Sequence, residues 1–247
     1  MTSESTNTQP KKVSGRKLRL LGSGGALLLT IAVAVHFTWM YSGSNRWESV
    51  IDKNGTQVYT LKAPGSLVKR VKGVTHVKAS MNTVAAAMMS GTTEDCKKWF
   101  PGCSSIQSIK SSNAQDRIFL FRVKAFRPFA PREFLLEGRT TQDSQTKAVT
   151  VEFTAVPDEI PQNACCYRVS HMANSWRFTP LDNGLVEVEN RVNMDIGIPY
   201  FMFNRFMPGG QFRMLGRLQK YLDEKKGATF EGIEEKTLAT ALTGGAM

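Results

Sequence analysis

The sequence lacks the motifs that mark the common enzyme classes. Its 247 residues include only three histidines. The H-E-x-x-H pattern of zinc peptidases, the G-x-S-x-G pattern of serine hydrolases and the phosphate-binding P-loop do not occur. There is no C-x-x-C pair, so the sequence supports neither a zinc knuckle nor a thioredoxin-type redox site. These absences favour a protein that is not an enzyme and that holds neither a metal nor another cofactor.

Basic residues are numerous, but no long Lys/Arg run follows the N-terminal region. The formal net charge is +11. The first 46 residues carry a net charge of +5, and the remaining residues carry +6 with basic and acidic side chains alternating. Because a nucleic-acid surface needs clustered positive charge, we expect no nucleic-acid partner. Mild attraction to an anionic membrane is compatible with this charge.

The N-terminal region predicts a membrane span. Residues 1–15 are rich in Ser, Thr and Asn and are expected to be disordered. No charged residue occurs from Leu20 to Ser44, and the stretch ends in the aromatic residues Phe37, Trp39 and Tyr41. A helix of this length matches a hydrocarbon core of roughly 30 Å, and aromatic residues are typical of its interface with water.

The flanking charges predict the orientation of this span. Five basic residues precede it, and only Arg46 closely follows it. The positive-inside rule therefore places the N-terminus in the cytoplasm and the folded domain outside, in the periplasm if the organism is bacterial. A cleaved signal peptide is the alternative, with Ser42-Gly43-Ser44 as small residues for a peptidase. We divide the chain into a disordered basic segment (1–19), an anchor or signal peptide (20–43), a folded domain (44–224) and a tail (225–247) without a readable role.

The four cysteines fall into two pairs. Cys96 and Cys103 flank the turn Pro101-Gly102, which could bring them together. Cys165 and Cys166 are adjacent, and adjacent cysteines rarely bond to each other. For both pairs, buried free cysteines are the alternative.

The folded part predicts three short helices and a series of strands. We expect helices at 44–52, 81–89 and 93–100. Strands are expected at 56–61, 68–77, 106–109, 117–124, 134–141, 148–156, 165–172, 175–179 and 185–194, with a bulge at Gly73. Regular spacing and hairpin-like breaks favour a curved antiparallel sheet, and the absence of alternating βα units argues against a Rossmann-like fold.

A long amphipathic helix is expected at 198–221. Apolar residues recur there at intervals of three and four, and Pro199 suits its first turn. Pro208-Gly209-Gly210 is expected to break or kink the helix in its middle.

Several short motifs occur in order along the folded part. They are Trp47-Glu48, Val58-Tyr59, Lys69-Arg70-Val71-Lys72-Gly73, Trp99-Phe100, Ala130-Pro131-Arg132-Glu133-Phe134, Ser175-Trp176, Gly197-Ile198-Pro199, Phe203-Asn204 and Met207-Pro208. In order and spacing they resemble the START family, the steroidogenic-acute-regulatory-related lipid-transfer domains, from about Trp47 to Leu222. The sequence departs from the family pattern at Glu133, where the family has Asp, and at Ser175, where it has Gly.

The resemblance implies an α+β helix-grip fold, in which a curved antiparallel sheet wraps around the long C-terminal helix. That fold encloses a hydrophobic tunnel for one lipid, roofed by the helix. The alternation of apolar residues on the strands is consistent with such a tunnel. The residues expected to line it are Phe119, Phe121, Val123, Val151, Phe153, Tyr167, Arg168, His171, Trp176, Phe201, Met202 and Phe206.

Polar residues inside the tunnel are harder to assign. An acid–arginine pair that this fold often contains cannot be carried over, because Phe119 falls where the acid would lie. Arg132 and Glu133 are expected to form a structural pair at the start of a strand. Arg168 and His171 are the best internal polar candidates, and an inward Arg168 would need an anionic partner.

We therefore expect a membrane-anchored protein that binds or transfers a lipid, such as a sterol, a phospholipid or a fatty acid. Its expected partners are this lipid and the membrane. Two alternatives remain open at this stage. One is a membrane-tethered module that binds a protein partner and has a collapsed pocket. The other is a hydrolase or cyclase that uses His171 with Tyr167 as acid and base.

Overall fold

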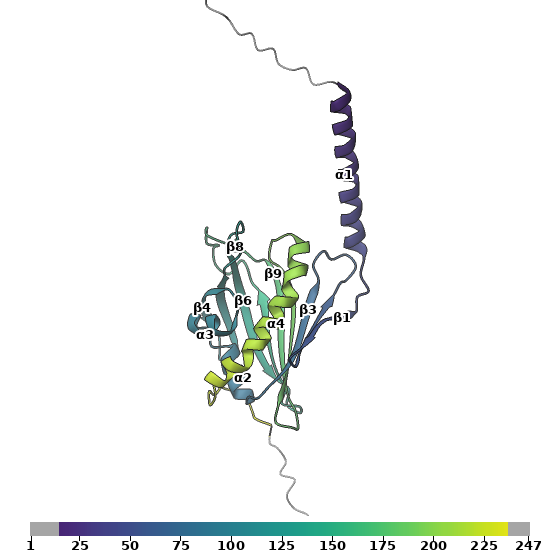
Figure 1. The fold of residues 1–247 in the computed structure, drawn as a ribbon. Coiled ribbons are helices and arrows are strands. Elements are labelled where there is room, and N and C mark those ends of the chain that lie inside the picture. Colours follow the sequence, from purple (N-terminus) through teal and green to yellow (C-terminus); the bar gives the residue numbers. More distant parts are fainter. Residues whose placement is uncertain (1–14, 237–247) are drawn as a thin grey trace, which may run out of the picture.

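The computed structural model describes residues 15–236, and the surroundings of side chains from residue 24 onward. Residues 1–14 of the expected disordered segment and residues 237–247 of the tail lie outside the described residues. A long helix, α1 (Gly15–Tyr41), projects from a domain built of one sheet and three helices (Figure 1). Because α1 begins at Gly15, residues 15–19, which include the basic residues Arg16, Lys17 and Arg19, belong to the helix rather than to the segment before it.

One large sheet forms the framework of the domain. Its strands are β1 (Trp47–Lys53), β2 (Thr56–Leu61), β3 (Arg70–Val77), β4 (Cys103–Ser111), β5 (Asp116–Val123), β6 (Arg132–Gln142), β7 (Val149–Ala155), β8 (Tyr167–Arg168), β9 (His171–Pro180) and β10 (Val186–Asp195). Their order is β1-β2-β3-β10-β9-β7-β6-β5-β4, with antiparallel neighbours, and β8 pairs with β6 in parallel. Helix α4 (Tyr200–Glu224) crosses one face of the sheet (Figure 1). The expected helix-grip architecture is confirmed.

The first hairpin corrects one prediction. Residues 47–53 form strand β1, not the helix expected at 44–52. Asn54 and Gly55 are the two loop residues, with φ of 53° and 70°, and Lys53 pairs with Thr56. Two positive φ angles in a two-residue loop are typical of the type I′ turn, which joins antiparallel strands. The Asn-Gly pair therefore makes a hairpin rather than ending a helix.

Strand β9 corrects a second prediction. The strands expected at 165–172 and 175–179 are instead a two-residue strand, β8, and one continuous strand of ten residues, β9. Every residue from His171 to Pro180 pairs with β10, so the ladder has no interruption at Ala173 or Asn174. The break in the chain lies before His171, not after Met172.

Helix α4 packs closely against the sheet. It buries Leu215, Leu218 and Leu222 in the main core. A Cβ atom at Gly73 would lie 2.4 Å from Leu215 Cδ1, so glycine is needed there for this close approach, and the register shows no bulge. The helix continues through Pro208, so it does not break there, and a kink at this position stays a prediction.

The helices that cover one end of the sheet are α2 (Met81–Met88) and α3 (Thr93–Trp99). The side chain of Ser80 caps α2, and Thr92 caps α3 by accepting a hydrogen bond from the Asp95 N–H. Cys96 and Cys103 form a disulfide that joins α3 to β4, and Cys165 and Cys166 also form a disulfide. Both pairs are therefore bonded, including the adjacent pair for which bonding was not expected.

Helix α1 is long and apolar enough to cross a membrane between Gly24 and Tyr41. The C-terminal end of α1 is attached to the domain by specific contacts. Trp39 stacks on Tyr200 of α4, with ring centroids 6.2 Å apart, and its indole N–H donates to the Leu67 carbonyl. The buried Lys62 donates to the carbonyls of Met40 and Ser42, which supplies positive charge at the C-terminus of α1. The start of α4 and the end of α1 thus meet at one end of the domain (Figure 1).

The segment after α4 returns to the domain. The Glu235 carboxylate accepts hydrogen bonds from the N–H groups of Met81 and Asn82 at the N-terminus of α2, at 3.0 and 2.9 Å. Phe230 and Ile233 pack against the main core. Residues up to Lys236 are therefore part of the folded domain, which extends beyond the boundary expected at 224.

Candidate functional site

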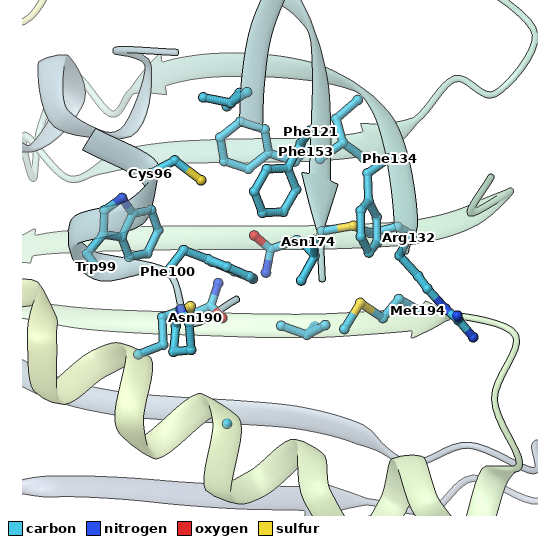
Figure 2. A pocket seen from close by; sticks show the side chains of 18 of the residues that line it. Cys96, Trp99, Phe100, Phe121, Arg132, Phe134, Phe153, Asn174, Asn190 and Met194 are labelled. Atoms are coloured by element: carbon cyan, nitrogen blue, oxygen red, sulfur yellow. The ribbon is translucent and has the colours of Figure 1, made fainter. Parts of the chain in front are cut away.

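A cavity of about 360 Å³ lies between the sheet and the helices α2, α3 and α4. Ligand pockets commonly have volumes of roughly 300–1,000 Å³. Many of its lining residues are aromatic or sulfur-containing, among them Met88, Trp99, Phe100, Phe119, Phe121, Phe134, Phe153, Met172, Trp176, Met194, Met207 and Met214. Figure 2 shows Phe121, Phe134 and Phe153 facing the same space as Trp99 and Phe100. Among the described residues that line this space, none is an aspartate, glutamate, histidine or tyrosine.

Part of the expected lining lies on this wall. Phe119, Phe121, Val123, Phe153 and Trp176 line the cavity. Their contact with a ligand stays a prediction.

The other expected lining residues lie elsewhere. Val151 belongs to the core, while Phe201 and Phe206 of α4 are exposed. Met202 is half-buried on α4, outside the cavity lining. Phe201 and Phe206 were expected to point inward because they fall on an apolar stripe of α4, but that stripe is wider than the face that the sheet covers.

Arg168 and Glu133 form a buried ionic cluster that does not line the cavity. Glu133 is fully buried, and its carboxylate accepts hydrogen bonds from Arg168 Nη2 at 2.6 Å and from Arg122 Nε at 2.7 Å. Burial alone would raise the pKa of Glu133, but these hydrogen bonds outweigh burial and hold its pKa below the ordinary value. Arg168 thus has a protein partner and needs no ligand anion.

Arg132 was expected to pair with Glu133, and this prediction is wrong. The Arg132 guanidinium donates instead to the backbone carbonyls of Ala130, Ile196 and Gly197. Its side chain borders the cavity, but the guanidinium points away from the other labelled side chains (Figure 2). Arg132 therefore fixes the turn between β10 and α4.

His171 and Tyr167 do not form a site. His171 is exposed at the first residue of β9, and Tyr167 is 41% exposed. Tyr167 packs against Gly197, where a Cβ atom would lie 2.4 Å from its ring. The acid–base pair that an enzyme would need is therefore not assembled in the cavity. The collapsed pocket of the partner-binding alternative is not observed either.

Behind the cavity wall, Trp99 stacks on Tyr221 of α4, with ring centroids 5.7 Å apart. The Tyr221 hydroxyl donates to the Ala87 carbonyl at 2.9 Å. Burial raises the pKa of Tyr221 to about 12, so this residue remains neutral at physiological pH. Tyr221 thus supports the wall and carries no charge next to it.

Three buried amides are the polar residues that the sequence analysis missed. Asn174 on β9, Asn190 on β10 and Gln211 on α4 line the cavity and are 8%, 0% and 2% exposed. The sequence offers a weak signal for two of them, since Asn190 alternates with the charged Glu189 and Arg191 along β10, and Asn174 alternates with Ala173 and Ser175 along β9. That same alternation would have placed Asn174 on the side of Trp176.

One end of the cavity is bordered by the loop after β5 and by the first half of α4. Phe126 from the loop and Met207 from the helix line it there. The rings of Phe126 and Phe206 meet with centroids 6.3 Å apart. Phe126, Phe201 and Phe206 are 48%, 64% and 57% exposed. This end therefore presents the large apolar side chains of Phe126 and Phe206 to the surroundings, and α4, which also exposes Phe201, connects it to the attachment of α1 at Tyr200.

Comparison with known proteins places this geometry in a known fold. No family model matches the sequence. An uncharacterised protein of Pseudomonas aeruginosa is 26% identical over 207 residues, which cover 81% of this chain and 99% of that protein.

Solved lipid-transfer domains have the same architecture. A STAR-related lipid transfer protein from Xanthomonas axonopodis superposes with a TM-score of 0.64 at 20% identity, covering 72% of this chain and 98% of that one. The lipid transfer and protein localization domain of human StarD13 gives 0.62 at 15% identity, with coverage of 72% and 89%. Human StAR-related lipid transfer protein 5 gives 0.59 at 16% identity, with coverage of 81% and 98%. The described domain has the START helix-grip fold, as the resemblance in the sequence predicts.

Proposed function

We propose that the chain is a membrane-anchored lipid-binding protein that holds one hydrophobic molecule in the cavity. The apolar lining of the cavity is the observation that supports this function most directly. Water gains few hydrogen bonds in such a space, whereas an apolar ligand buries its surface there. Among the described residues that line the space, none is an aspartate, glutamate, histidine or tyrosine, so we propose binding or transfer rather than catalysis.

The attachment of α1 supports a membrane as the source of the ligand. Trp39 and Tyr200 hold the end of α1 against the start of α4, and Phe201 is exposed beside Tyr200. The exposed ring of Phe126 lines the cavity and meets the exposed ring of Phe206 on the same helix. Apolar side chains at such a surface favour contact with the acyl boundary of a bilayer. In this arrangement, a lipid passes between the bilayer and the cavity without crossing bulk water.

The proposed orientation follows from the charges around α1. Basic residues precede the span, so the N-terminus is cytoplasmic and the domain extracytoplasmic. In bacteria this location is the periplasm. The two disulfides fit an oxidising compartment.

The first half of α4 is the proposed gate. Pro208 lacks a backbone donor, and Gly209 and Gly210 lower the stability of the helix beside it. Met207 and Gly210 line the cavity, so displacement of this segment would open the wall. A lipid could then enter without disruption of the Leu215–Leu222 half of the helix, which is packed in the core.

The proposal is tested by transfer of a fluorescent lipid into the cavity. The full chain in phosphatidylcholine liposomes is mixed with an acyl lipid that carries a dansyl group at the chain end. Trp99 and Trp176 line the cavity and should transfer excitation energy to the bound probe. Val192→Phe with Leu136→Phe adds volume to the wall and should remove most of this transfer. Val50→Phe, at an exposed position on β1, is the matched control and should not. Equal transfer in all three proteins would contradict the proposed function.

A further inference from the structure

The three buried amides are linked to the backbone of the sheet. Gln211 Nε2 donates to Asn190 Oδ1 at 2.7 Å, and Asn190 Nδ2 donates to the Ser175 carbonyl at 3.2 Å. Asn174 Nδ2 donates to the Arg191 carbonyl at 3.0 Å. These contacts join α4, β10 and β9 at the cavity wall.

The backbone carbonyls that accept hydrogen bonds from Asn174 and Asn190 determine the orientation of these two amide groups. A backbone carbonyl can only accept a hydrogen bond, so the nitrogen of Asn174 must face Arg191 and that of Asn190 must face Ser175. Rotation of Asn174 by 180° would place two acceptors against each other. The orientation of Asn174 is therefore determined by the backbone, and its oxygen is directed elsewhere.

The Asn174 oxygen opens into the cavity. Within residues 24–236, no protein donor forms a hydrogen bond with Asn174 Oδ1, and this atom stays accessible from the cavity although the residue is only 8% exposed. Figure 2 shows the Asn174 side chain extending between Phe100 and Phe153. Acceptors inside native proteins are nearly always satisfied by protein or water, so when an apolar ligand replaces water in this cavity, the donor to Asn174 Oδ1 has to come from the ligand.

The cations near the cavity do not compete for this role. Lys124 and Arg213 are exposed, and the Arg132 guanidinium is occupied by three backbone carbonyls. An anionic headgroup placed at Asn174 would face a partial negative charge without a counter-ion, which is unfavourable in a low-dielectric site.

We infer that the ligand is an uncharged amphiphile whose polar end, a hydroxyl or an amide N–H, donates a hydrogen bond to Asn174 Oδ1. This inference rests on the proposed lipid-binding function and adds the chemical class of the ligand. It places the polar end of the ligand inside the cavity, at the middle of β9, with the apolar chain along the aromatic and methionine wall.

Three probes with the same chain length separate the chemical classes. 1-Hexadecanol carries a donor, methyl hexadecanoate carries no donor, and hexadecanoate at pH 8 carries a negative charge. The full chain is placed in phosphatidylcholine nanodiscs with equal amounts of the three probes, and the adducts that remain on the ejected protein are counted by native mass spectrometry. We expect the alcohol to be bound about two- to tenfold more than the ester, the range expected for one hydrogen bond, and more than the anion.

Variants test whether Asn174 causes this preference. Asn174→Leu should bring the ratio of alcohol to ester close to one without reducing the ester adduct. Met194→Leu, also on the wall, should keep the wild-type ratio. A preference for the ester or the anion in the wild-type protein, or an alcohol preference that survives in Asn174→Leu, would overturn the inference while leaving lipid binding intact. If Asn174→Leu does not fold, the wild-type ranking decides alone. Absence of every adduct would contradict the proposed function itself and the inference with it.

Discussion

Replacement of Glu133 by glutamine should strongly destabilise the domain. The Glu133 side chain is 0% exposed and that of Arg168 is 6% exposed, whereas that of Arg122 is 28% exposed. Glu133→Gln keeps the shape of the side chain but leaves the Arg168 cation buried without a counter-charge. Loss of one partner of a buried ion pair costs about 3–5 kcal/mol. Because the glutamine oxygen can still accept one hydrogen bond, we expect about 3 kcal/mol.

This free energy corresponds to a measurable change in the melting temperature. For a domain of this size, 1 kcal/mol shifts the midpoint by about 2–4 °C, so Glu133→Gln should lower it by about 6–12 °C. The measurement is thermal unfolding followed by tryptophan fluorescence. Glu152→Gln, at an exposed position on β7, is the matched control and should change the midpoint little. A loss below about 1 kcal/mol for Glu133→Gln, or a loss equal to that of the control, would refute this account of the cluster.

The same cluster predicts a pH dependence. The pKa of Glu133 is lower in the folded state than in the unfolded chain. The carboxylate therefore contributes stability above its unfolded pKa of about 4.3, and this contribution is lost as the pH falls from there through the folded pKa. The difference in stability between the wild type and Glu133→Gln should be constant near neutral pH and should shrink in acid. A difference that grows as the pH falls would contradict the assigned charge state.

Three further predictions concern the C-terminal segment, the gate and the topology. Glu235→Gln should lower the free energy of unfolding, measured in urea, by about 1 kcal/mol, because it weakens the cap on α2. The control Glu231→Gln should have little effect, and equal effects of the two variants would contradict the role of Glu235. Gly209→Ala with Gly210→Ala should slow lipid exchange more than it changes the amount of bound lipid, because alanine stabilises the helix. Both alanines fit, since no heavy atom lies closer than 3.5 Å to either added Cβ. An unchanged rate of lipid exchange would place the gate elsewhere. A reporter enzyme fused after Met247 should be active only outside the cytoplasm, and cytoplasmic activity would reverse the topology.

The sequence was informative where a local pattern decides the structure. Alternation at Thr56–Leu61 predicted β2 with its observed bounds, and the apolar repeat predicted α4. The helix predicted at 44–52 is wrong because the Asn54-Gly55 pair that follows it can end a helix or form a hairpin, and pairing with β2 decides between them.

The site was less predictable because its contacts are distant in sequence. Glu133 meets Arg168 across 35 residues, and no local pattern distinguishes this partner from the neighbouring Arg132. Asn174 was missed because it falls between the strands expected at 165–172 and 175–179 and was therefore assigned to no face of the sheet. Its position in the cavity depends on the continuous ladder between β9 and β10, which sequence alone did not show.

Identification of the lipid carried by the protein tests the central claim most directly. A chain that begins at Ser44 lacks the span and is purified without detergent, and its bound molecules are extracted and counted by mass spectrometry against the protein. The account predicts about one lipid per protein in the wild type and little in Val192→Phe with Leu136→Phe, while Val50→Phe retains the wild-type amount. A folded wild-type protein that carries no stoichiometric lipid and takes up none from liposomes would contradict it.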